Sequence, residues 1–180
     1  MKLEATENLA KTLMNEHKLH GWGFRFNRRK TSTGRCVYRR VNWQFIPGFI
    51  ELSVHYVVRN PEETVTRTIL HEIAHALTQG HGHDVFWKEI AQAIGGSTDL
   101  CIDVPSAPYT ITASCPSCGN VFNRHRRPPR NKNWHCPPCG AENGRLIWYA
   151  VDANTRTENQ QSFEPRKYEG ETEKDRRSCW

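Results

Sequence analysis

The sequence predicts an α+β fold made of a helix, a small antiparallel sheet and two further helices, followed by a small second β module. Three observations support this class. Apolar residues recur with helical spacing near both ends of the first hundred residues, and the stretch between them alternates like β-strands. After a segment that contains Pro105 and Pro108, two C-x-x-C-G sequences follow. The part that holds them is too short for a large apolar core.

The first helix is predicted over residues 7–17. Its apolar residues Leu9, Ala10, Leu13 and Met14 share one face at helical spacing, which is expected to face the core.

Three strands are predicted after this helix, over residues 23–29, 35–41 and 49–57, where polarity alternates along the chain. A Thr-, Ser- and Gly-containing turn at residues 31–34 is expected to join the first two strands. The expected product is a small antiparallel sheet.

The second helix is predicted over residues 61–78. Asn60 is suited to its N-cap and Pro61 to its first position, and Glu63 stands at the capping-box spacing from Asn60. Glycines after this helix permit a sharp turn before a third helix, predicted over residues 84–94.

The second helix carries the run His71-Glu72-Ile73-Ala74-His75. Histidines four residues apart lie on one helix face, so both imidazoles can reach one Zn²⁺ at roughly 2.1 Å. Glu72 is placed to polarise a water molecule as a general base. A chance match is the alternative, but the helix-start signals before the run favour a catalytic zinc site.

Catalytic zinc usually takes three protein ligands and leaves one position open. His81 and His83 both follow the second helix closely enough to fold back onto the metal. Spacing alone does not choose between them.

Four cysteines predict a second, structural zinc site. They form two C-x-x-C-G knuckles that are separated by 17 residues, a spacing typical of four-thiolate zinc ribbons: Cys115, Cys118, Cys136 and Cys139. Redox dithiols or disulfides are the alternative, which the spacing and the expected compartment disfavour.

Residues 9–94 resemble the SprT-like metallopeptidase domain, the group that includes the spartan DNA–protein crosslink proteases. The matching stretches are residues 19–27, 34–38, 50–53 and 68–77.

Many members of this family carry a zinc ribbon after the protease domain, as this chain does. The resemblance implies a protease that acts on proteins bound or crosslinked to DNA. It also implies that the third ligand is a histidine followed four residues later by an aromatic residue, which fits His83 with Trp87. The chain departs from the family in having His81 nearby, and Asp84 where related proteins often have Gly.

Positive charge gathers in two stretches and predicts a polyanionic partner. The chain has a net charge of +6. Residues 17–50 carry eight basic and no acidic residues, and residues 115–150 carry six basic residues and one acidic residue. Such stripes attract phosphates, and an aromatic residue among them can stack on unpaired bases of single-stranded or damaged DNA. A merely solvated surface is the alternative. The candidate nucleic-acid-binding residues are Arg124, Arg126, Arg127, Arg130, Lys132 and Trp134.

The expected organisation is a metallopeptidase domain at residues 1–100, a linker at 101–113, a zinc ribbon at 114–150 and a disordered polar tail at 151–180. No signal-peptide core and no membrane-length apolar run occur. We therefore expect the protein in the cytoplasm, associated with the nucleoid, or in the nucleus of a eukaryote. We also expect it to be a monomer. The remaining cysteines, Cys36, Cys101 and Cys179, are expected to be reduced thiols.

Two functions from different classes follow. The first is a zinc endopeptidase that cleaves DNA-bound or DNA-crosslinked proteins, and the intact Glu72 favours it. The second is a nucleic-acid-binding zinc protein with a weak or inactive protease-like site that acts in transcription or replication. A housekeeping protease without DNA is disfavoured by the basic ribbon.

Overall fold

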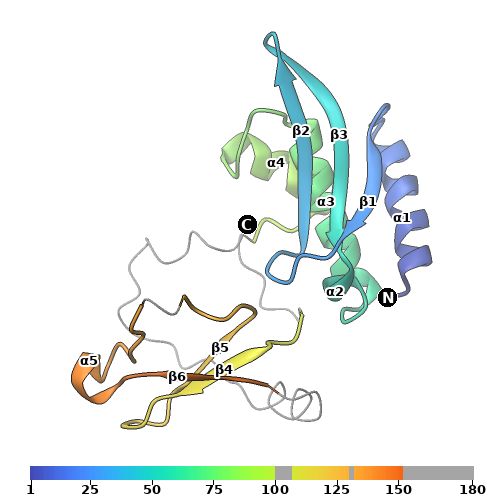
Figure 1. The fold of residues 1–180 in the computed structure, drawn as a ribbon. Coiled ribbons are helices and arrows are strands. Elements are labelled where there is room, and N and C mark those ends of the chain that lie inside the picture. The colour runs from blue at the N-terminus through green and yellow to red at the C-terminus, as the bar shows by residue number, and fades with distance from the viewer. Residues whose placement is uncertain (100–106, 130–131, 152–180) are drawn as a thin grey trace. The chain divides into compact units, whose positions relative to one another are not determined.

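The computed structural model describes residues 1–99, 107–129 and 132–151, which divide into two compact units, one within Met1–Ala107 and one within Pro108–Glu169 (Figure 1). The predicted tail lies almost wholly outside the described residues, as does about half of the predicted linker. No helix within the described ranges is long and apolar enough to cross a membrane.

The first unit combines helices with a three-stranded sheet, which confirms the α+β class. Its helices are α1 (Leu3–Glu16), α2 (Val54–Val57), α3 (Glu62–Leu77) and α4 (Val85–Ala93). Its strands are β1 (Gly23–Asn27), β2 (Gly34–Val41) and β3 (Gln44–Ser53). The helix α1 begins four residues before the predicted start, whereas α3 and α4 differ from the predicted bounds by one residue at each end.

The sheet is mixed, so the prediction of an antiparallel sheet is wrong for one of its two pairings. The strand order is β1-β3-β2: β3 pairs antiparallel with β2 and parallel with β1. The predicted hairpin between the first two strands does not form, because β3 lies between them. The hairpin instead joins β2 to β3 through Asn42 and Trp43, whose φ angles of +48° and +64° make the tight turn that brings Val41 opposite Gln44.

The predicted strand over residues 49–57 is wrong at both ends. β3 begins at Gln44, because its first half pairs with β2 beyond the reach of β1. Pro47 is tolerated there because it lies at the irregular step in the β2–β3 register, where β1 does not pair. Residues 54–57 form α2 instead, which buries Tyr56 and Val57 in the core.

The helix α3 is the central element of the first unit. It contacts α1, α4, β2 and β3 (Figure 1), and its Ile69 and Ile73 are fully buried against Ile50 and Leu52 of β3. His71 and Glu72 lie between these apolar positions and are also buried. The fold therefore holds His71 and Glu72 at fixed positions inside the unit.

The second unit is a three-stranded antiparallel sheet with a short helix. Its elements are β4 (Ile111–Ser114), β5 (Val121–Arg124), α5 (Gly140–Asn143) and β6 (Ile147–Ala150), and its strand order is β5-β4-β6. Since β4 begins at Ile111, the last three residues of the predicted linker belong to this sheet.

Candidate metal centres and nucleic-acid surface

Three histidines converge at one point of the first unit. His71 and His75 come from α3, and His83 comes from the loop that precedes α4. The His83 Nε2 atom lies 3.1 Å from His75 Nε2 and 3.4 Å from His71 Nε2. Nitrogen ligands of a tetrahedral zinc ion lie about 3.4 Å apart when each bond is about 2.1 Å. The three imidazoles therefore fit one zinc ion.

His81 lies outside this cluster. Its Nδ1 atom is 2.8 Å from the carboxylate of Asp84, and its ring lies against Phe86. Asp84 is also the N-cap of α4, where its side chain accepts a hydrogen bond from the Trp87 N–H. Spacing alone left His81 and His83 as alternatives, and the family resemblance favoured His83. The structure places His83 beside His71 and His75.

Trp87 is the packing partner shared by the three histidines. It is fully buried, and its ring centroid lies 4.7 Å from that of His71, 4.8 Å from that of His75 and 4.5 Å from that of His83. An aromatic residue four positions after His83 therefore supports the cluster from α4.

The orientation of His71 is set from outside the cluster. Its Nδ1 atom lies 2.7 Å from the Ser97 carbonyl oxygen, to which a protonated Nδ1 donates. In the neutral ring this leaves Nε2 as the lone-pair nitrogen that faces the other two histidines. Sequence reasoning missed Ser97, because it lies 26 residues after His71 in a segment without a motif.

Burial keeps the imidazoles neutral. Desolvation lowers the pKa of His71 to about 4 and that of His75 to about 3. The pKa of His83 is also lowered, chiefly by desolvation. Near neutral pH all three therefore present unprotonated nitrogens, the form that binds metal ions.

Glu72 is buried beside this cluster, and its Oε1 atom has no hydrogen-bond partner among the described residues. Burial raises the pKa of its carboxyl group to about 8, although the Cys36 backbone N–H and the Arg35 charge act in the opposite sense. A cation held by the histidines would also favour the carboxylate. The group is thus poised to gain and lose a proton near neutral pH.

Gly34 at the start of β2 provides the space for Glu72. A Cβ atom at this position would lie 2.6 Å from Glu72 Oε1 and 3.0 Å from Leu52 Cδ2, which is closer than van der Waals contact permits. Sequence reasoning took Gly34 for a turn residue and missed this role, because the contact depends on how β2 packs against α3.

The four predicted cysteines come together in the second unit. Their sulfur atoms lie within 4.8 Å of one another, and Cys118 Sγ is 3.6 Å from Cys136 Sγ. Zinc–sulfur bonds of about 2.3 Å place tetrahedral thiolates about 3.8 Å apart, so the cluster fits a closed structural zinc site. None of the cysteines within the described ranges forms a disulfide. Cys101 and Cys179 lie outside those ranges.

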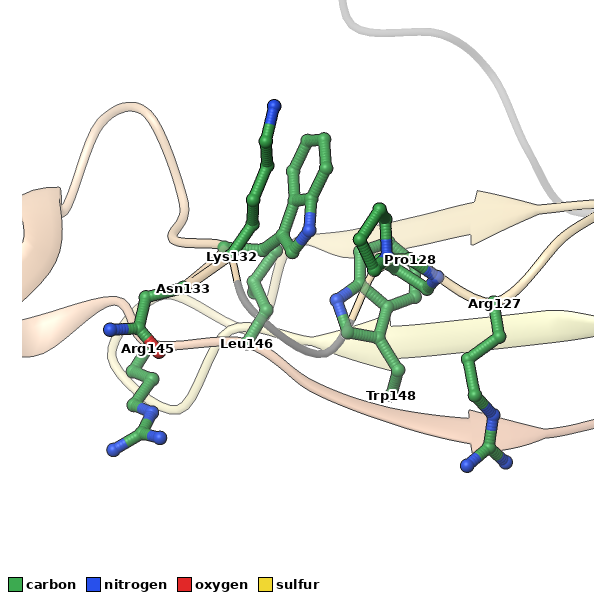
Figure 2. Close-up of a pocket in the computed structure, with 9 residues that line it drawn as sticks. Arg127, Pro128, Lys132, Asn133, Arg145, Leu146 and Trp148 are labelled. Carbon is green, nitrogen blue, oxygen red and sulfur yellow. The ribbon is translucent and has the colours of Figure 1, made fainter.

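The second unit also has a pocket of about 200 Å³ with aromatic and basic walls (Figure 2). Figure 2 shows Arg127 and Arg145 at opposite ends, with Trp148 between them. The lining residues are Arg127, Pro128, Pro129, Lys132, Asn133, Trp134, Arg145, Leu146 and Trp148. The indole N–H groups of Trp134 and Trp148 are buried and have no acceptor in the described parts of the chain.

The predicted nucleic-acid-binding residues are only partly gathered at this pocket. Arg127, Lys132 and Trp134 line it, and the Arg124 guanidinium lies 4.3 Å from the Trp134 ring centroid. Arg126 does not line the pocket, and Arg130 lies outside the described residues.

The prediction missed Arg145 and Trp148, which line the pocket from in and beside β6. The strand-like run at residues 147–150 was the sequence signal that could have indicated these two residues.

Comparison with known proteins gives two family matches. The model of the SprT-like family matches residues 3–106, and that of the SprT-like zinc ribbon domain matches residues 109–148. No curated protein matches the chain, and no solved structure matches it.

Proposed function

Because this chain belongs to the SprT-like family, whose model covers more than half of it, we propose that it is a zinc-dependent endopeptidase associated with DNA. Its substrates would be proteins that are bound or crosslinked to DNA. The observation that carries the proposal is the cluster of His71, His75 and His83 with the buried carboxyl group of Glu72 beside it.

The residues of the cluster would divide the work of peptide hydrolysis. The three neutral imidazoles would hold zinc, which supplies Lewis acidity and makes water acidic enough to be deprotonated near neutral pH. Glu72 would accept the proton of the attacking water and deliver it to the leaving amine, which its raised pKa favours. Trp87 and the Ser97 carbonyl would keep the imidazoles in place during turnover.

The second unit would serve binding rather than chemistry. Four thiolates fill the coordination of a zinc ion and leave no position for a substrate. The pocket that Trp134 and Trp148 help to line offers aromatic side chains and surrounding cations. Unpaired bases and their phosphates match such a surface, so single-stranded or damaged DNA is the proposed ligand.

A nucleic-acid-binding protein with a weak or inactive protease-like site is the second candidate. Glu72 favours it in one respect, because only 2% of this residue is exposed and water must reach it for catalysis. Such a protein would act in transcription or replication through the ribbon alone.

The test measures zinc content and cleavage of a DNA-binding protein, with and without single-stranded DNA, for the wild type and Glu72→Gln. Glu63→Gln is the matched control, since it removes the same charge from an exposed position of α3. We expect two zinc ions per chain in all three proteins and DNA-stimulated cleavage that only Glu72→Gln abolishes.

Two other outcomes are informative. Full cleavage by zinc-loaded Glu72→Gln would contradict the assigned role of Glu72. Two zinc ions and tight DNA binding without any cleavage by the wild type would favour the second candidate.

A further inference from the structure

The hairpin of β2 and β3 carries an exposed tryptophan at its tip. The hairpin extends well past the helices of the first unit (Figure 1). Its turn consists of Asn42 and Trp43, and Trp43 is 84% exposed.

The turn geometry does not favour a tryptophan. Two-residue turns with positive φ at both positions prefer Asn followed by Gly. Asn42 follows this preference, but Trp43 places a bulky side chain at a φ of +64°, where residues with a Cβ atom are strained. The exposed ring gains little packing in return. Folding alone therefore does not explain this residue, and unexplained strain at an exposed position points to binding.

The surroundings of Trp43 indicate the chemistry of its partner. The Arg40 guanidinium lies 4.5 Å from the Trp43 ring centroid and 5.4 Å from that of Phe45. Arg39 and Arg40 are adjacent in β2 and point to opposite faces of the hairpin. No acidic residue occurs in residues 17–50. The tip thus presents a broad aromatic surface and two cations to an anionic partner.

We propose that this hairpin tip is a second contact for single-stranded DNA, in which an unpaired base stacks on Trp43 while Arg40 binds the adjacent phosphate. Arg39, on the other face of the hairpin, would bind a phosphate further along the strand. Stacking on an aromatic face with flanking cations is the usual chemistry of such contacts. The site lies in the first unit, so it is separate from the ribbon pocket. The proposal rests on the proposed function only in its class of ligand, single-stranded DNA.

The test uses the full chain and a fluorescein-labelled oligothymidylate, with affinity measured by anisotropy at constant salt. We expect Trp43→Gly to weaken binding about five-fold or more and also to raise the thermal midpoint, because it restores the preferred Asn-Gly turn. Trp43→Phe keeps an aromatic face and should retain most of the affinity. Arg40→Gln should weaken binding and reduce its salt dependence.

A stabilised Trp43→Gly protein with unchanged affinity for the oligonucleotide would overturn the proposal, and a protein or lipid partner would then be the ligand to seek for the tip. A lowered thermal midpoint together with weaker binding would overturn it as well, because the tryptophan would then be structural.

A second measurement separates this proposal from the ribbon assignment. Oligothymidylate that contains 5-iodouracil is photo-crosslinked to a chain with Trp134→Ala, and the attachment site is mapped by mass spectrometry. Attachment at Trp43 supports the hairpin contact even if the ribbon does not bind DNA. Attachment only within residues 107–151, or none, would refute the hairpin contact.

Discussion

The position of the Glu72 side chain depends on a missing side chain as well as on contacts. Gly34 leaves no Cβ where the carboxyl group lies, and Leu52 closes the space from β3. The Cys36 backbone N–H is directed to the same carboxyl group. Three residues of the sheet thus fix the position of one side chain on α3.

The raised pKa of Glu72 predicts how the stability of the metal-free protein depends on pH. Its pKa is about 8 in the folded chain and 4.5 ordinarily. Between these values the unfolded chain has lost a proton that the folded chain keeps, so stability falls as pH rises through this window. Glu72→Gln removes this pH-dependent contribution to stability. The thermal midpoint of the variant should therefore rise relative to that of the wild type as the pH increases from 4.5 to 8.

The measurement is thermal unfolding of both proteins in a chelator across that range. His71 and His75 titrate in both proteins, so their effect cancels in the comparison. Glu63→Gln, which alters an exposed carboxyl group of the same helix, should show no such trend. A difference between Glu72→Gln and wild type that stays constant with pH would contradict the prediction.

At this scale the sequence predicts ligands better than their supports. His71, Glu72 and His75 are recognisable because helical spacing places them together without reference to any other element. Gly34 and Ser97 act through contacts between distant segments. No local pattern marks those contacts, so they became visible only in the folded chain.

The loop between α3 and α4 is the element that brings the third histidine to the site. It bends at Gly80, whose φ is +92°, and its Gly80 N–H donates a hydrogen bond of 2.9 Å to the Tyr38 hydroxyl group of β2. The Phe45 ring of β3 packs so closely that a Cβ atom at Gly80 would lie 2.8 Å from it. The β2–β3 hairpin therefore holds the loop that carries His83 through one hydrogen bond and one close packing contact.

We expect Tyr38→Phe to loosen this loop and to weaken zinc binding at the histidine site. The lost hydrogen bond is worth about 0.5–1.5 kcal/mol, and the expected weakening is therefore about two- to ten-fold. Chelator competition measures the affinity, with the ribbon zinc as an internal reference. Tyr109→Phe, a partly exposed tyrosine of the second unit, is the matched control. Equal zinc affinity in Tyr38→Phe and wild type would show that the hairpin does not position His83.

The strands show what element-level prediction lacks. Alternation located the ends of β1 and β2 to within two residues, and helical spacing located the ends of α3 and α4 to within one residue. The pairing was wrong because Asn42-Trp43 lacks the glycine that marks a tight hairpin, whereas the segment at residues 31–34 has one. The parallel pairing of β1 with β3 connects segments far apart in sequence, which alternation does not encode.

We expect the two units to depend on zinc to different degrees. In the first unit the core is a continuous apolar cluster of α1, α3 and β3, and its histidine site lies beside that cluster. In the second unit the buried cluster consists of Ala113, Cys115, Cys136 and Leu146, so two of its four members belong to the candidate zinc site. A core of this size contributes little without the metal.

Chelation of zinc should therefore unfold the second unit and leave the first folded. Hydrogen exchange followed by mass spectrometry should show rapid exchange in β4 and β6, with protection retained in α3 and β3, and added zinc should restore the protection. Cys118→Ser should give the same pattern without a chelator. Protection of β4 that survives complete zinc removal would contradict the prediction.

The same experiment bears on DNA binding, because a zinc ion held by the four cysteines would hold the ribbon pocket together. Trp134 lies two residues before Cys136, and its carbonyl oxygen accepts a hydrogen bond of 2.8 Å from the Leu146 N–H. Loss of the metal should therefore separate Trp134 from Trp148 and remove the pocket. The hairpin tip is formed by β2 and β3 alone and should persist. Chelated protein should thus lose the ribbon contribution to DNA affinity and keep the part that Trp43→Gly removes.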